Sequence, residues 1–310
     1  MTPADPGPTL PPMRAPTPLA ACLFPTCLLP TCLLAAGCVT PETTATTCAD
    51  IALAQPLLVL EGDLRTTSGL GRVDAEGCLT EVAGGLALGS DTWLAVSGGQ
   101  AYVLDRTEAL AHRIDPASLE ILESVRAQED GEGGRPNPQD IAVDEAGRRW
   151  VTRFDQPLVL VFGPDGSIER RIDLAPYADA DGNPEASAIR VVDGVAHVAL
   201  EKLDAQAEGS IYPPTGPGAV LAIPTDPAAS IQAIDLAGQN PFGRFAAAPW
   251  DPRLLAVATP GEFGAITPGD GIDLIDTASG QARQIISEEA LGGSATEVAL
   301  VGPNEAYAIV

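Results

Sequence analysis

The chain has 310 residues and a formal net charge of −25 at pH 7, with 17 Lys and Arg residues against 42 Asp and Glu residues. A charge this negative argues against binding to nucleic acid, because phosphate contacts require basic side chains. It also argues against electrostatic docking on anionic lipid. Because 45% of the residues are hydrophobic, many of them in Val, Ile, Leu and Ala runs, we expect a folded chain and not a disordered one.

Residues 1–37 have the pattern of an export signal, because an apolar run over residues 17–37 ends in small residues directly before Cys38. The segment LAAGC that ends at Cys38 resembles a bacterial lipobox. The resemblance implies that residues 1–37 are a lipoprotein signal peptide and that Cys38 carries a lipid such as palmitate, which anchors the protein to a membrane. The expected location is the bacterial cell envelope at the outer membrane, facing the periplasm or the cell surface.

An ordinary transmembrane anchor is the alternative, since roughly 20 apolar residues suffice to span a bilayer. Pro25 and Pro30 interrupt the run and argue against it. The start of translation is also open between Met1 and Met13, and a start at Met13 places Arg14 directly before the apolar run.

Six cysteines are present, of which three lie in the predicted signal peptide and one is Cys38. The remaining two are Cys48 and Cys78, and an oxidising compartment favours a disulfide between them. Two thiols without histidines nearby argue against a zinc site. The disulfide would join the Thr-rich segment over residues 38–50, which we interpret as a tether, to the first strands of the folded domain.

Beyond the tether, short strand-like runs alternate with Gly, Pro, Asp and Asn, and we find no sustained helical period. Residues 140–174 form the clearest unit, with four strand candidates and a predicted hairpin turn at residues 163–166. Similar units begin at Ser187 and Arg244, and an earlier one covers residues 85–126. Residues 51–83 supply strands of an initial incomplete unit, and residues 296–310 match two strands of another.

Four strands per unit, repeated along the chain, predict an all-β fold, a β-propeller of four-stranded blades over residues 51–310. A β-sandwich or an open solenoid is the alternative. We expect six or seven blades in the full protein. The last unit lacks two strands, so we expect either residues beyond Val310 or completion of the blade by the strands at residues 51–83.

The stretch over residues 137–174, with its WVT strand, its Asp- and Gly-containing turns and its IDL strand, resembles the repeat of bacterial extracellular propellers related to surface-layer and quinoprotein-like repeats. The stretches YADADGNPEAS and GQNPFGR resemble those of lipid-anchored propellers from Gram-negative bacteria. This resemblance covers most of residues 50–310 and implies a fold and a location more than an activity.

Three Asn-Pro pairs precede the first strand of a unit, and equivalent positions of a propeller repeat lie on one face of the disc. We therefore predict a polar ligand site at the mouth of the central channel. The alternative is that Asn-Pro only initiates a turn and sets the direction of the strand. The predicted ligand-binding residues are Asn137, Asp140, Asn183, Glu185, Asn240 and Arg244.

A second candidate site is the acidic loop with Asp179, Asp181, Asn183 and Glu185, whose oxygen ligands alternate as Ca²⁺ requires. It does not follow the EF-hand pattern, and a merely solvated acidic loop is the alternative. Ca²⁺ is the one cofactor that the sequence suggests.

Catalytic signals are weak, because no nucleophile elbow, zinc motif, phosphate loop or dinucleotide fingerprint is found. His112 and His197 both lie in expected strands. The leading hypothesis is a non-catalytic, anchored binding module for an unknown protein or small-molecule ligand. The alternative is a calcium-dependent, lactonase-like hydrolase at the central channel, with Asp140 and Glu185 among the metal ligands.

Overall fold

The computed structural model describes residues 57–310 except 63, 75–77, 81–85, 87 and 209–211. The chain divides into a unit over Met1–Thr47 and a unit over Cys48–Val310, and only the second contains described residues. The predicted signal peptide, Cys38, the tether and Cys48 lie outside the described residues. No helix in the described part of the chain is long and apolar enough to cross a bilayer.

The described strands form six antiparallel sheets in which neighbours along the chain are paired. The N-terminal sheet and blade A contain β1 Leu57–Gly62, β2 Ser68–Val73 and β3 Leu79–Thr80, then β4 Thr92–Ser97, β5 Gln100–Asp105, β6 Leu110–Ile114 and β7 Ile121–Arg126. Blades B and C contain β8 Pro138–Val143, β9 Arg149–Arg153, β10 Leu158–Phe162 and β11 Ile168–Asp173, then β12 Ala186–Val192, β13 Val195–Leu200, β14 Pro217–Pro224 and β15 Gln232–Gln239. Blade D and the C-terminal hairpin contain β16 Phe242–Ala248, β17 Asp251–Thr259, β18 Gly271–Asp276 and β19 Gln281–Ser287, then β20 Glu297–Gly302 and β21 Glu305–Ile309.

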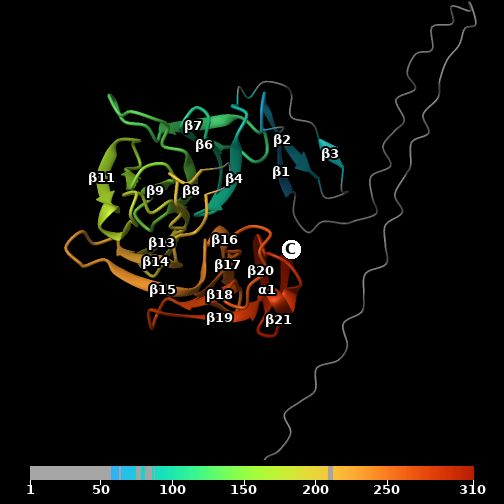
Figure 1. Cartoon of the computed structure of the whole chain (residues 1–310). Coiled ribbons are helices and arrows are strands. Elements are labelled where there is room, and N and C mark those ends of the chain that lie inside the picture. Colours follow the sequence, from blue (N-terminus) through green and yellow to red (C-terminus); the bar gives the residue numbers. More distant parts are fainter. Residues whose placement is uncertain (1–56, 63, 75–77, 81–85, 87, 209–211) are drawn as a thin grey trace, which may run out of the picture. The chain divides into compact units, whose positions relative to one another are not determined.

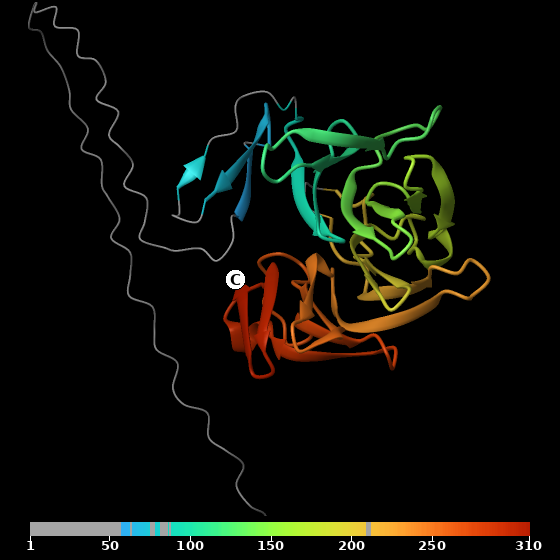
Figure 2. The ribbon, with the colours of Figure 1, turned by 180° about the vertical axis from the view of Figure 1, so that it is seen from behind.

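The first strands of successive sheets meet one another. β4 contacts β8, β8 contacts β12, β12 contacts β16, and β16 contacts β20. Figure 1 and Figure 2 show the sheets following one another in chain order about these inner strands. This arrangement confirms the predicted β-propeller of four-stranded blades, of which four are complete in the described residues. The total of six or seven blades stays a prediction.

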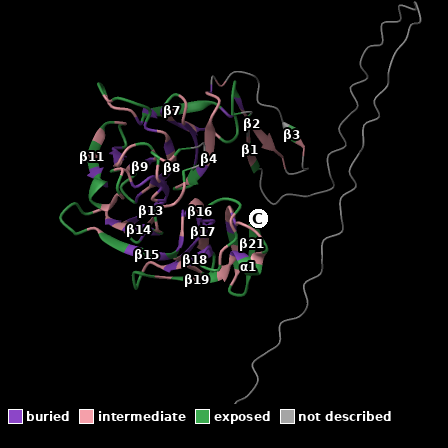
Figure 3. Cartoon of the chain, viewed as in Figure 1, coloured by how far each residue is buried: buried purple, intermediate pink, exposed green. Residues whose placement is uncertain are grey.

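The hydrophobic core lies between neighbouring blades. One cluster joins Trp150 and Val161 of blade B to Val198 and Leu221 of blade C, and similar clusters lie between the other neighbouring sheets. Because neighbouring blades cover both faces of the middle strands as well, β9, the second strand of blade B, is buried at every position. The outer strand β11 instead alternates between exposed and less exposed residues, and Figure 3 shows exposure concentrated at the outer strands. The described residues also contain two short helices, a 3-10 helix at Ala175–Tyr177 and α1 at Glu288–Leu291.

The turns of blade B follow from their sequences. Asp144 accepts hydrogen bonds from the backbone N–H groups of Ala146 and Arg148, at 3.0 Å each, and from the Trp150 indole at 2.9 Å. The turn at residues 163–166 connects β10 to β11, as predicted, and its Gly166 has φ 85°, which favours glycine. The strands of the two units predicted to be incomplete do not pair with each other in the described residues. β1–β3 form a sheet of their own, and β20 pairs with β21.

Candidate functional site

In blades B, C and D, one residue just before the first strand has a left-handed backbone conformation. Asn137, Glu185 and Asn240 have φ values of 52°, 47° and 53°. Asparagine tolerates this conformation better than most residues. Asn240 Nδ2 donates to the Gly261 carbonyl at 2.9 Å, so this side chain fixes a neighbouring loop of its own blade. The Asn-Pro pair at Asn240 thus has a structural role in its strand connection.

The structure divides the six predicted ligand-binding residues among several places. Asp140 and Arg244 line a cavity of about 510 Å³ among the inner strands, whereas Asn240 lines a separate pocket at the other end of these strands. Asn183 Nδ2 donates to the Phe154 carbonyl at 2.7 Å. Asn137 accepts a bond from Gln139 Nε2 at 3.2 Å. Neither Asn137, Asn183 nor Glu185 lines either cavity.

Asp140 connects two blades. Its Oδ1 accepts the Ile141 N–H at 2.9 Å, and its Oδ2 accepts the Ile189 N–H of blade C at 3.0 Å. Burial of this carboxyl raises its pKa to about 6, partly offset by these hydrogen bonds and by Arg244. Its contacts identify Asp140 as a cross-blade hydrogen-bond acceptor.

The residues of the predicted calcium loop are engaged in other contacts. Asp179 Oδ2 accepts the Thr215 hydroxyl at 2.6 Å, and Asp181 bonds the backbone N–H groups of Asn183 and Ala205 at 2.9 and 3.2 Å. Glu185 Oε2 accepts the Leu203 N–H at 2.8 Å. Within the described residues no three His, Cys, Asp or Glu side chains form a group suited to hold a metal ion. The calcium site stays a prediction.

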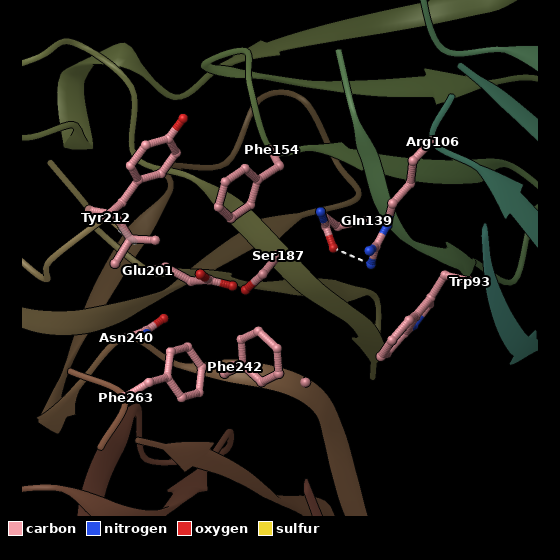
Figure 4. A pocket seen from close by; sticks show the side chains of 12 residues that line it. Trp93, Arg106, Gln139, Phe154, Ser187, Glu201, Tyr212, Asn240, Phe242 and Phe263 are labelled. Carbon is pink, nitrogen blue, oxygen red and sulfur yellow. Dashed lines mark hydrogen bonds between the residues drawn. The ribbon is translucent and has the colours of Figure 1, made fainter. Parts of the chain in front are cut away.

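The channel pocket, a cavity of about 210 Å³, opens between blades A to D where the inner strands begin. Its walls combine aromatic and polar side chains, as Figure 4 shows. The aromatic members are Trp93, Phe154, Tyr212, Phe242 and Phe263. The polar members are Arg106, Gln139, Ser187, Glu201 and Asn240. Apolar walls with few convergent polar groups are typical of small-molecule sites.

The rings on two sides of the channel pocket have defined partners. Phe242 and Phe263 form an edge-to-face pair, with centroids 5.3 Å apart and planes at 87°. Across the pocket, the guanidinium carbons of Arg106 and Arg244 lie 4.9 and 4.8 Å from the ring centroid of Trp93. Arg106 is held by Asp91 at 3.3 Å and by Gln139 at 2.5 Å. These contacts give the pocket a basic, aromatic wall at Trp93.

The opposite wall is acidic. Glu201 is 4% exposed, and burial raises its pKa to about 8 despite the nearby Ser187 hydroxyl and Arg106. Glu185 lies behind it, since the Glu201 N–H donates to the Glu185 carbonyl at 3.1 Å. Burial, together with Asp181, Asp179 and Glu201, raises the pKa of Glu185 to about 8 as well. Both carboxyls therefore ionise less readily than an exposed glutamate.

Sequence reasoning missed most of this pocket, although a repeat signal marks it. Arg106, Phe154 and Glu201 each follow directly after the second strand of their blade. Equivalent positions of successive blades meet at one end of the channel. The residues after the second strands could therefore have predicted the pocket as well as the Asn-Pro pairs did. The two histidines lie in strands as expected, His112 in β6 and His197 in β13, and both are buried.

No known protein family matches the sequence, and no curated protein matches it either. Among solved structures, a catalytically inactive variant of virginiamycin B lyase from Staphylococcus aureus with quinupristin is similar at a TM-score of 0.51 and 14% identity, covering 80% of this chain and 79% of that chain. Kuenenia stuttgartiensis hydrazine synthase matches at a TM-score of 0.48 and 16% identity over 70% of this chain; the match spans only 54% of that chain. BamB from Moraxella catarrhalis matches at a TM-score of 0.39 and 12% identity, over 73% of this chain and 63% of that one.

The arrangement of the blades and the first of these similarities define the class of protein. The chain is a β-propeller with a pocket at the mouth of its channel. Identities this low show the fold alone, so the function is argued from the pocket.

Proposed function

We propose that this protein is a non-catalytic binding propeller of the bacterial cell envelope, tethered through a lipid on Cys38, that holds a small ligand in the channel pocket. The observation that supports binding is the pocket itself, with five aromatic side chains and a buried carboxyl facing one cavity of about 210 Å³. This volume is below the roughly 300–1,000 Å³ of pockets for drug-sized molecules, which favours a small ligand.

Several features favour binding over the alternative hydrolase. A hydrolase needs a nucleophile or an activated water beside a positioned base. The serine hydroxyl of the pocket, Ser187 Oγ, donates to the Pro241 carbonyl at 3.0 Å. Both histidines lie within strands of the blades. Asp140 and Glu185, the proposed metal ligands, accept backbone N–H groups.

A thermal-shift panel of small amines, carboxylates, sugars and amino acids tests the binding function. We expect at least one compound class to raise the melting temperature of the wild type and not that of a Phe242→Ala/Phe263→Ala variant. No stabilising compound, or equal shifts in both proteins, would contradict the proposal. A melting-temperature change of several degrees between millimolar Ca²⁺ and chelator, together with lactone hydrolysis, would favour the hydrolase instead.

The envelope location is tested separately by membrane fractionation. We expect the wild type in the membrane fraction and a Cys38→Ser variant in the soluble fraction, because the variant has no thiol to acylate. Retention of Cys38→Ser in membranes would refute the anchor. The proposed Cys48–Cys78 disulfide is tested by thiol labelling of the denatured, non-reduced protein, in which neither cysteine should react.

A further inference from the structure

The channel pocket contains a buried carboxyl, Glu201, that forms no ion pair among the described residues. Glu201 is only 4% exposed, and its side chain points into the pocket beside Ser187 (Figure 4). None of the ion pairs among the described residues involves Glu201. A buried carboxyl is costly unless it is neutral or paired. The ionised form of Glu201 has no ion-pair partner among the described residues, so a cationic ligand can supply one.

Aromatic rings surround the same carboxyl. Figure 4 shows Phe154 and Tyr212 on one side of Glu201 and Phe242 and Phe263 on the other. The edge-to-face pair of Phe242 and Phe263 presents ring surfaces at right angles, at 87°. Ring faces attract ammonium groups through the aromatic quadrupole, and the attraction increases where water is excluded.

We propose that the channel pocket binds a small organic cation whose ammonium head lies beside Glu201, among the rings of Phe154, Phe242 and Phe263. This inference rests on the proposed binding function and assigns the chemical class of its ligand. The cavity of about 210 Å³ limits the ligand to a small head group with a short chain.

Electrostatics on two scales supports a cation. The net charge of −25 gives the protein a negative potential that concentrates cations near its surface. Locally, Asp179 and Asp181 add negative charge near Glu185, which lies behind Glu201, and both raise the pKa of Glu185. A bound ammonium offsets these charges and favours the ionised form of Glu201.

Arg106 does not oppose this assignment. It lies at the Trp93 end of the pocket and is ion-paired with Asp91 at 3.3 Å. A cation at the Glu201 end therefore meets a guanidinium whose charge is already compensated.

The test uses titration calorimetry at pH 8.5 on the whole mature protein with choline and with its neutral carbon isostere, 3,3-dimethylbutan-1-ol. The two probes have nearly the same shape and differ in charge. We expect choline to bind at least tenfold more tightly than the isostere. We expect Glu201→Gln to weaken choline binding at least tenfold, while the isostere is unaffected.

Glu145→Gln is the matched control, because Glu145 is an exposed residue in a turn of blade B and the substitution removes the same charge. It should leave choline binding within twofold of the wild type. Equal affinity for choline and the isostere, or equal effects of the two Glu→Gln variants, would overturn the proposal. If neither probe binds but a sugar or carboxylate of the thermal-shift panel does, the cation assignment is wrong and the binding function stands.

Melting curves show whether Glu201→Gln is folded before its affinity is interpreted. A second variant, Phe154→Leu, keeps Glu201 and removes one aromatic face. We expect it to weaken choline severalfold without weakening the isostere, and equal loss for both probes would count against an ammonium among the rings.

Discussion

The two ends of the propeller channel are built from different parts of the repeat. At one end, loops and the first residues of the inner strands surround the channel pocket with aromatic rings and Glu201. At the other end, the cavity of about 510 Å³ is lined by the inner strands themselves, with Gly98, Gly99, Asp140 and two arginines. The strand-lined cavity is larger and more polar, yet its buried carboxyl already has two backbone partners.

The difference shows which kind of polar group is available to a ligand. Asp140 is committed to hydrogen bonds between blades B and C, so its removal should affect stability. Glu201 has a hydroxyl neighbour and no ion pair among the described residues, so its removal should affect binding. A polar residue in a propeller channel is thus interpreted by its partners and not by its position alone.

The largest effect is expected at the strand-lined end. Asp140→Ala leaves the N–H groups of Ile141 and Ile189 without their acceptor, and we expect a loss of roughly 3–5 kcal/mol in the free energy of unfolding. Asp140→Asn keeps one acceptor and should lose less. Urea denaturation measures both, and an unchanged midpoint for Asp140→Ala would refute the cross-blade role.

The next largest effect is a pH dependence of the stability, caused by Glu185 and Glu201 at the channel-pocket end. Glu185 and Glu201 have pKa values raised from 4.5 to about 8 by burial, with Asp179 and Asp181 facing Glu185 and with Ser187 and Arg106 facing Glu201. Between these pH values the folded state holds protons that the unfolded state has released. Stability should therefore be highest at and below about pH 4.5 and fall toward pH 8 by several kcal/mol, because each unit of pKa shift corresponds to about 1.4 kcal/mol.

The double variant Glu185→Gln/Glu201→Gln should flatten this dependence, because neither amide titrates. The measurement is the urea midpoint from pH 5 to 8.5 in both proteins. Equal slopes in the wild type and the double variant would show that these two carboxyls are not the cause.

A smaller effect is expected for Phe242→Leu, which removes one ring from the channel pocket and keeps an apolar side chain. We expect about a fivefold weaker choline affinity, corresponding to roughly 1 kcal/mol of cation–π attraction. The change in stability should remain below about 1.5 kcal/mol. Calorimetry with choline and the neutral isostere separates the two effects, because a general disturbance of the pocket weakens both probes.

The smallest effect is expected for Arg190→Ala. Arg190 is an exposed residue of β12 at the strand-lined cavity. We expect its removal to change the free energy of unfolding by less than about 0.5 kcal/mol and to leave choline affinity unchanged. A large loss of choline affinity would indicate that the two ends of the channel act as one site.

The fold was accessible from the sequence, because blade B repeats strand and turn signals within a short stretch. The turn residues Asp144 and Gly166 predict local backbone geometry, and the structure places them in such turns. The channel pocket was less accessible, because Phe154, Glu201 and Phe263 come from three blades and only the propeller brings them together. The sequence also does not reveal that the side-chain amides of Asn183 and Asn240 donate hydrogen bonds to backbone carbonyls.

The stacking at Trp93 gives the protein a built-in optical signal. Of the three tryptophans, Trp150 is fully buried, Trp250 is 41% exposed at the surface, and Trp93 alone lines the channel pocket. Its indole lies within 5 Å of the guanidinium groups of Arg106 and Arg244, and these arginines line the two different cavities. The emission of Trp93 should therefore respond to events at either end of the channel, so intrinsic fluorescence can follow ligand uptake without a label.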